Sequence, residues 1–181
     1  MSVFIIITLV SLLVCSLSAF GESAEESESA LCGDTELDVG EFRVTVPRGW
    51  LAIPVMNMFG DNQNAPKTDT IKLCKGAVSP FDLFSKPNME IIFYDKVQGV
   101  MPPKSIYRDV SELVPFVTGE HVWGGFRAFA FAGKKLTLLW EDTGVFQYQV
   151  NIWADGDDSS ISLTDEDVIT ILSSIAPNTA D

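Results

Sequence analysis

Residues 121–153 have the sequence HVWGGFRAFAFAGKKLTLLWEDTGVFQYQVNIW, and their pattern decides the fold. The stretch predicts three β-strands joined by tight turns at Gly133-Lys134-Lys135 and Asp142-Thr143-Gly144. The first two strands are apolar on both faces, whereas the third is apolar on one face only. Because a strand that is apolar on both faces must be covered on both, we expect a sheet with a covered middle and a more hydrated edge at the third strand.

Apolar residues alternate or run together in four earlier segments, which predict further strands at residues 42–46, 50–56, 71–74 and 89–94. In the irregular connection 77–88, Phe81 and Phe84 are expected to anchor the loop.

Two other segments have an apolar stripe at helical spacing. The stripes are Ile106, Val110 and Leu113 after Pro102-Pro103, and Val168, Ile169, Leu172 and Ile175 after Thr164. Two such helices fit the two faces of one sheet. The predicted class is therefore α+β, an antiparallel β-sheet flanked by helices on both faces in an α/β/α sandwich.

The N-terminal region predicts export. Residues 3–19 are almost wholly apolar, and Ala19-Phe20-Gly21 places small residues before a cleavage point at Glu22, although no Lys or Arg precedes Arg43. We expect a signal peptide at 1–21, an acidic, Ser-rich disordered spacer at 22–35 and a single domain at 36–177. An uncleaved anchor and a lipid anchor on Cys15 are the alternatives.

The charge of the chain limits the classes of partner that it is expected to bind. The chain has 25 acidic and 12 basic residues, a formal net charge of −13. Nucleic acids and anionic membranes are recognised by clustered Lys and Arg, which this sequence lacks. We expect a secreted or extracytoplasmic protein, with cell-surface anchoring as the alternative, that contacts no nucleic acid and no membrane beyond the signal peptide.

Removal of the signal peptide would leave two cysteines, Cys32 and Cys74. An even number of cysteines in an exported chain suggests a disulfide between them. The alternative is two unrelated free thiols.

Several motifs carry a family resemblance: FRVTVPRGW at 42–50, KGA..PFDLFSKPNMEIIFYD at 75–95, WGGF at 123–126 and DEDVITILSSI at 165–175. The chain resembles the Mog1/PsbP-like superfamily, and within it uncharacterised exported bacterial proteins, over roughly residues 36–176. The resemblance implies an antiparallel sheet between helices and a role in binding or assembly. It carries over no catalytic residue.

The sequence contains few candidate catalytic or cofactor-binding residues. His121 is the only histidine, and a small secreted hydrolase would need a cleft that gathers it with a serine and a carboxylate, but no G-x-S-x-G motif is present. In WGGF, the two glycines are expected to allow a bulge or close backbone packing. Zinc and nucleotide motifs are missing from the sequence, and no cofactor is expected.

The segment 155–166, DGDDSSISLTDE, allows two interpretations. As a calcium-dependent module, Asp155, Asp157, Ser159 and Glu166 would be ligands, but Ser160 occupies the position where such a loop needs glycine. As an ordinary helix start, Thr164 would be the N-cap. The capping interpretation explains the acidic residues without a metal.

One polar strand face is a candidate ligand surface. Gln147, Gln149, Asn151 and Trp153 share a face of the third strand, and Trp153 is the tryptophan expected to be exposed. A solvated edge strand would have the same pattern.

Together these features predict a non-enzymatic exported domain that binds or helps to assemble an extracytoplasmic protein or small ligand, with the hydrolase and the calcium module as alternatives.

Overall fold

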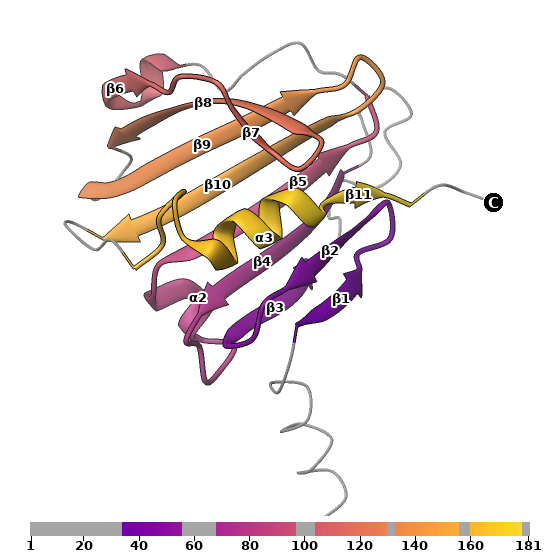
Figure 1. Ribbon diagram of the computed structural model, residues 1–181. Helices are drawn as coiled ribbons and strands as arrows, with labels where there is room; N and C mark the ends of the chain where they lie inside the picture. Colours follow the sequence, from indigo (N-terminus) through magenta and orange to yellow (C-terminus); the bar gives the residue numbers. More distant parts are fainter. Residues whose placement is uncertain (1–33, 56–67, 97–103, 130–132, 156–159, 179–181) are drawn as a thin grey trace, which may run out of the picture. The chain divides into compact units, whose positions relative to one another are not determined.

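The computed structural model describes residues 34–55, 68–96, 104–129, 133–155 and 160–178 (Figure 1). All of them belong to one compact unit, Asp34–Asp181. The predicted signal peptide and most of the predicted spacer lie outside the described residues, and both stay predictions. Thr35, the last residue of that spacer, begins strand β1.

The main sheet is antiparallel throughout. Its order is β3 (Trp50–Val55), β4 (Thr68–Lys75), β5 (Asn88–Tyr94), β10 (Gln147–Asp155), β9 (Lys134–Asp142), β8 (His121–Phe129) and β6 (Arg108–Glu112), and β7 (Phe116–Thr118) also pairs with β8. A small second sheet contains β1 (Thr35–Asp38), β2 (Phe42–Val46) and β11 (Ala176–Pro177).

The three strands predicted from residues 121–153 are confirmed as β8, β9 and β10. The predicted hydrated edge is wrong, because β10 lies between β9 and β5 in the interior of the sheet. Gln147, Gln149 and Asn151 are consequently buried. The local pattern could not reveal this position, since it depends on pairing with β5, which is far away in the sequence.

One side of the main sheet, which we call the α3 face, carries Tyr148, Val150 and Ile152 of β10. Helix α3 (Glu166–Ser174) and the small sheet lie over this face (Figure 1). Their apolar side chains, including Phe42, Val44, Val168, Ile171 and Leu172, form one buried cluster with the strands beneath. Burial of this cluster is the main source of stability in the fold.

The other side, which we call the glutamine face, carries Gln147, Gln149 and Asn151. The helix described on this side is the four-residue α2 (Asp82–Ser85), whose Leu83 packs against Cys74 and Ala77. Helices that flank both faces, as the predicted α/β/α sandwich requires, are not shown within the described residues; the α+β class stands. None of the described helices is long and apolar enough to cross a membrane.

The predicted helix with Ile106, Val110 and Leu113 is wrong. Only Lys104–Ile106 form a short 3₁₀ helix, η1, and Arg108–Glu112 form strand β6. The reason is tertiary: β8 has apolar side chains and an open edge, and the backbone of β6 pairs with that edge through a register shift between Arg108 and Ser111. Sheet pairing therefore overrides the helical spacing of the apolar residues.

Helix α3 is confirmed but begins one residue later than expected. Its N-cap is Asp165, not Thr164, and the Asp165 carboxylate accepts a hydrogen bond from the Ser162 backbone N–H at 3.1 Å. The exposed Thr164 hydroxyl lies 3.0 Å from that of Ser162. Of the predicted apolar stripe, Ile169 is 39% exposed, and Ile171 is buried in its place.

Candidate functional site

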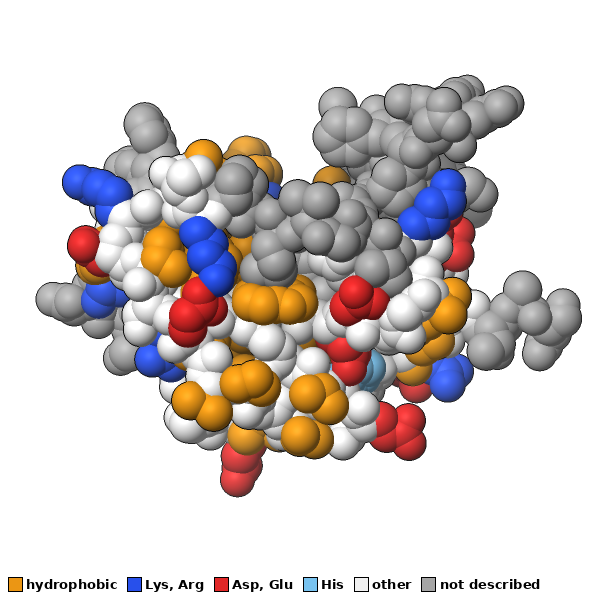
Figure 2. All heavy atoms as spheres, turned by 90° about the horizontal axis from the view of Figure 1, so that it is seen from above, with side chains coloured by type: hydrophobic (Ala, Val, Ile, Leu, Met, Phe, Trp, Pro, Cys, Tyr) orange, Lys and Arg blue, Asp and Glu red, His pale blue; other side chains and the backbone are white. Residues whose placement is uncertain are grey.

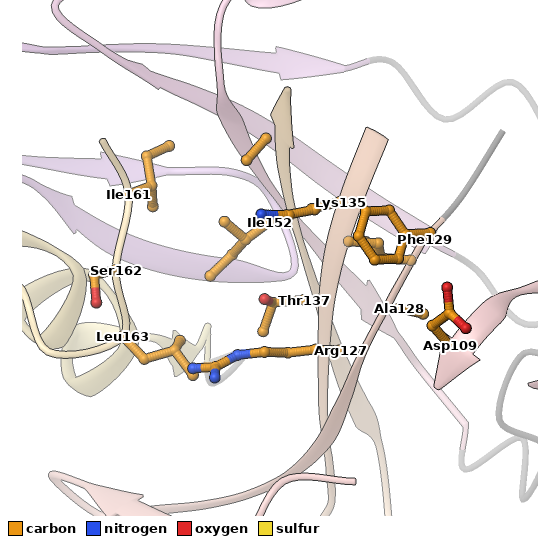
Figure 3. A pocket seen from close by; sticks show the side chains of 12 residues that line it. Asp109, Arg127, Ala128, Phe129, Lys135, Thr137, Ile152, Ile161, Ser162 and Leu163 are labelled. Atoms are coloured by element: carbon orange, nitrogen blue, oxygen red, sulfur yellow. The ribbon is translucent and has the colours of Figure 1, made fainter. Parts of the chain in front are cut away.

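A cavity of about 440 Å³ opens on the α3 face at the ends of β8, β9 and β10 (Figure 3). Its floor contains Arg127 of β8, Thr137 of β9 and Ile152 of β10, and one wall is the segment Ile161-Ser162-Leu163 that leads into α3. These residues meet because Thr137 lies directly opposite both Arg127 and Ile152 in the register of the three strands. The cavity is thus built on regular strands, which hold their side chains precisely.

The lining combines apolar walls with cationic groups. Ile152 and Ile161 are buried, and Phe129 and Leu163 are half-buried. The Lys135 ammonium lies 5.9 Å from the centroid of the Phe129 ring. Although the net charge of the chain is −13, an arginine and a lysine line this largely apolar cavity.

Arg127 is the residue of this cavity that is best suited to bind a ligand. Its side chain is exposed and crosses the floor toward Leu163 (Figure 3). Within the part of the chain that the structure describes, neither Arg127 nor Thr137 has a side-chain hydrogen bond or an ion pair. A guanidinium without a partner, beside a hydroxyl, is a ready donor set for a carboxylate.

Asp109 lies at the rim and has an unusual backbone. Its φ is 53°, in the left-handed region, at the register shift where β6 bulges against β8. Aspartate tolerates this region better than most residues. Its carboxylate points away from the Arg127 side chain (Figure 3), so it leaves the guanidinium open to the cavity.

His121, the basis of the hydrolase alternative, lies elsewhere on the α3 face. Its Nδ1 is 2.6 Å from Oε2 of Glu141, and its Nε2 is 2.7 Å from the backbone oxygen of Ile175. Glu141 also accepts a hydrogen bond from the Val122 N–H at 2.8 Å. Both ring nitrogens face acceptors, and no hydroxyl of the described residues forms a hydrogen bond with the ring. The geometry is that of a link between β8, β9 and the end of α3.

Tyr148 packs beside His121 with their rings edge to face, 5.9 Å between centroids. Its hydroxyl is buried and has no hydrogen-bond partner among the described residues. Burial, and then the charge of Glu141, raise the pKa of Tyr148 well above its ordinary value. The tyrosine is therefore held in its neutral form by its surroundings.

The predicted ligand face is brought together by β10 and extended by β5 and β4. The Gln149 amide donates to Asn151 at 3.0 Å, and Asn151 donates to Glu90 at 3.1 Å. Glu90 in turn lies 3.4 Å from the Lys72 ammonium. These groups satisfy one another, and Trp153 is half-buried beside an apolar cluster. The solvated-edge alternative is wrong, and ligand binding at this face stays a prediction.

The remaining predicted sites are scattered. Asp155 lies 3.5 Å from the Lys134 ammonium and Glu166 is the first residue of α3, while Asp157 and Ser159 lie outside the described residues. No three His, Cys, Asp or Glu side chains of the described residues are grouped as a metal site.

The predicted Cys32–Cys74 disulfide is not formed in this structure. Cys32 lies outside the described residues, and Cys74 is a free, fully buried thiol with its Sγ 3.4 Å from the Pro87 carbonyl oxygen. Leu83 of α2 and Ala77 pack against Cys74. Burial raises the pKa of the Cys74 thiol.

The similarity of the chain to known proteins is low. No family model matches the chain, and no curated protein matches it. Among solved structures, the chain is similar to the solution structure of cyanobacterial PsbP (CyanoP) from Synechocystis sp. PCC 6803. The TM-score is 0.45 and the identity 10%, over 80% of this chain and 92% of that one. The two chains are similar at low identity, and membership of the Mog1/PsbP-like superfamily stays a prediction from the sequence.

Proposed function

We propose that this chain is an exported, non-enzymatic binding domain whose ligand is a small molecule with an apolar body and a carboxylate group. The ligand occupies the cavity between β8–β10 and residues 161–163. The observation that carries the proposal is the position of Arg127, a cation without an ion-pair partner among the described residues, beside an apolar hollow of about 440 Å³. That volume lies within the usual range of small-ligand sites, roughly 300–1,000 Å³.

The two ends of the ligand are served by different side chains. The carboxylate accepts paired hydrogen bonds from the Arg127 guanidinium, whose planar fork matches a carboxylate better than it matches a single-point acceptor. The Thr137 hydroxyl donates a further hydrogen bond from the neighbouring strand. The hydrocarbon part packs on Ile152, Ile161 and Leu163, which gain contacts and lose water.

A binding role is preferred to a hydrolytic one because of the surroundings of His121. Both of its ring nitrogens are already engaged by Glu141 and Ile175, which leaves neither free to take a proton from a hydroxyl nucleophile. Export rests on the apolar N-terminal stretch and places the binding outside the cytoplasm.

Titration calorimetry with octanoate and with octanamide tests the proposal. The two probes have the same hydrocarbon tail, but the amide has no charge. We expect octanoate to bind the full chain more tightly than octanamide by roughly 10- to 100-fold, the effect of a charge-assisted hydrogen bond. Arg127→Gln is expected to remove this preference.

The matched control is Arg108→Gln. Arg108 is an exposed arginine on the neighbouring strand β6 and does not line the cavity, so this variant should keep the native preference. Equal binding of the two probes by the native protein would contradict the proposal. So would an unchanged preference in the Arg127 variant.

A further inference from the structure

The two short contacts of the His121 ring require two protons. Nδ1 faces Oε2 of Glu141 at 2.6 Å, and Nε2 faces the backbone oxygen of Ile175 at 2.7 Å. Each hydrogen bond needs a proton between its two atoms, and a carbonyl oxygen supplies none. A neutral imidazole carries a single proton. The geometry is therefore that of an imidazolium ion beside a carboxylate, and the number of protons is the same if the first one lies on the carboxylate.

The surroundings of the ring suit a positive charge. The side chains of His121 and Glu141 are each 12% exposed, and Figure 2 shows the histidine, in pale blue, largely covered and beside an acidic side chain. The ring centroids of Trp123 and Tyr148 lie 5.5 and 5.9 Å from that of His121. Aromatic rings at such distances attract a cation, and the attraction between the paired charges is stronger where water is scarce.

Few other titratable groups surround this pair. Burial, and then the charge of Glu141, raise the pKa of Tyr148 well above its ordinary value, so this neighbour on β10 stays neutral at moderately basic pH. Glu120, on the turn before β8, and Arg43, on the strand that pairs with β11, are both exposed. Strands β7 and β11 and the last turn of α3 contain no acid or base. A proton lost here near neutral pH therefore comes from the pair of His121 and Glu141.

The two contacts respond differently to the loss of one proton. A hydrogen bond from an N–H group to a carboxylate is stronger than one to a neutral carbonyl oxygen. The remaining proton therefore stays between Nδ1 of His121 and Glu141. Nε2 then directs a lone pair at the Ile175 oxygen, and two acceptors without a proton between them repel each other at 2.7 Å.

The Ile175 carbonyl lies where the covering layer meets the main sheet. Ile175 directly follows α3 and precedes β11 (Ala176–Pro177), which pairs with β2 of the small sheet. The next residue, Asn178, donates its backbone N–H to the Glu41 oxygen at 2.9 Å. These bonds hold the segment to the small sheet whatever the charge of the histidine. The bond from His121 is the one that holds it to β8.

We propose that His121 is a proton-dependent latch between the main sheet and the end of α3. In the imidazolium form it holds the Ile175 carbonyl. Deprotonation of Nε2 releases that carbonyl, while the contact with Glu141 continues to join β8 and β9. The release is local, because the small sheet retains the segment after α3. The latch does not depend on the cavity.

Nuclear magnetic resonance of the native chain tests the latch directly, because the chain contains one histidine. The ¹⁵N signals of the His121 ring and the ¹³C signal of the Ile175 carbonyl are followed from about pH 5 to about pH 9, the range in which an unperturbed imidazole loses its proton. We expect two protonated nitrogens at the acidic end and loss of the proton from Nε2 at the basic end. The Ile175 signal should move with the same midpoint.

Three results of this titration would overturn the proposal. The first is a ring whose protonation does not change over the range. The second is loss of the proton from Nδ1 in place of Nε2. The third is an Ile175 carbonyl signal that does not follow the ring. Because these measurements use the native protein, they decide the question even where a variant fails to fold.

The substitution His121→Asn provides a second test, since an amide does not titrate. In this variant the Ile175 signal should stay constant over the same range. Urea denaturation should show that the variant unfolds more readily than the native protein, with a ratio of unfolding constants roughly fivefold larger at about pH 5 than at about pH 9. The sign follows because the latch is present when the ring is protonated and is lost as the pH rises. Equal ratios at the two pH values would contradict the latch.

The matched control is Glu120→Gln. This substitution removes an exposed carboxylate next to His121 in the sequence and leaves both contacts of the ring in place. The Ile175 signal should move with pH as it does in the native protein. An Ile175 signal that no longer moves in this variant would assign the titration to Glu120 and overturn the proposal.

Discussion

His121 and Glu141 join strands β8 and β9 through a contact of 2.6 Å between Nδ1 and Oε2. Both side chains are only 12% exposed, so the pair is sheltered from water. The second ring nitrogen reaches the carbonyl oxygen of Ile175 at the end of α3. The only histidine of the chain thus ties the sheet to its covering helix.

Removal of Glu141 should therefore destabilise the fold. Glu141→Ala leaves the Nδ1 of His121 and the Val122 N–H without their acceptor, and we expect a loss of about 1–3 kcal/mol in the free energy of unfolding. Urea denaturation measures this value. Glu120→Ala, an exposed carboxylate on the neighbouring turn, should change it by less than about 0.5 kcal/mol. Equal effects of the two substitutions would argue against the link.

For Tyr148, which packs beside His121, we predict that a substitution does not destabilise the fold. Its hydroxyl is buried without a partner among the described residues, so Tyr148→Phe removes a desolvated polar group and keeps the ring contacts. We expect the free energy of unfolding to be unchanged or to rise by up to about 1 kcal/mol. A drop of that size would show that the hydroxyl has a hydrogen-bond partner.

Gly124 lies opposite Trp140 and needs to lack a side chain. A β-carbon there would come within 2.9 Å of the indole ring, closer than side-chain atoms approach. Replacement of glycine by alanine within a strand normally stabilises it by roughly 0.5–1 kcal/mol. We expect Gly124→Ala instead to destabilise the protein by about 1–3 kcal/mol, because the Trp140 ring must move. Thermal unfolding shows whether the substitution raises or lowers the stability, and a higher melting temperature would contradict the close contact.

Asp167 should contribute to acid sensitivity. Its pKa is lowered first by the hydrogen bond from Lys75 and then by that from Trp50, whose Nε1 lies 3.1 Å from Oδ2. A carboxylate whose folded-state pKa is lowered stabilises the fold above its ordinary pKa, and this contribution is lost as the pH falls through the folded value. Since the ordinary pKa is 3.8, the loss should occur below about pH 4.

The substitution Asp167→Asn isolates this effect. The variant should be less stable at neutral pH, and its free energy of unfolding should vary less with pH between about pH 5 and pH 2. Glu166→Gln, which removes the neighbouring exposed carboxylate without a lysine partner among the described residues, is the matched control. Identical acid denaturation of the native protein and the Asp167 variant would disprove the assignment.

Cys74 should react slowly in the folded protein. Its sulfur is fully buried, and its raised pKa keeps it in the thiol form, which is the unreactive one. We expect iodoacetamide to label Cys74 only after denaturation, and to do so without prior reduction. Peptide mass spectrometry identifies the labelled residue. Labelling that requires a reductant would show that Cys74 is held in a disulfide.

Local sequence patterns predicted the elements better than their arrangement. Alternating side chains and the Asp142-Thr143-Gly144 turn were enough to predict β8, β9 and β10. Two errors arose from long-range pairing: β5 encloses β10, and β8 recruits β6 from a segment with helical spacing. Hydrophobic periodicity contains no information about which strands meet.

The cavity was missed for a related reason. Arg127 is the only charged residue between Val122 and Phe129, and a lone arginine on a largely apolar strand was the available signal. Its significance depends on Thr137 and Ile161, which register and chain reversal bring beside it. By contrast, the role of the WGGF glycines in close packing was predicted correctly, because glycine inside a strand typically marks a bulge or a close approach of neighbouring atoms.

The most direct test of the binding proposal is a crystal structure of the protein with octanoate. We predict the carboxylate within about 3 Å of the Arg127 guanidinium, and the hydrocarbon chain against Ile152, Ile161 and Leu163. A structure with Arg127 paired to an acidic side chain of the protein and octanoate outside the cavity would contradict the account.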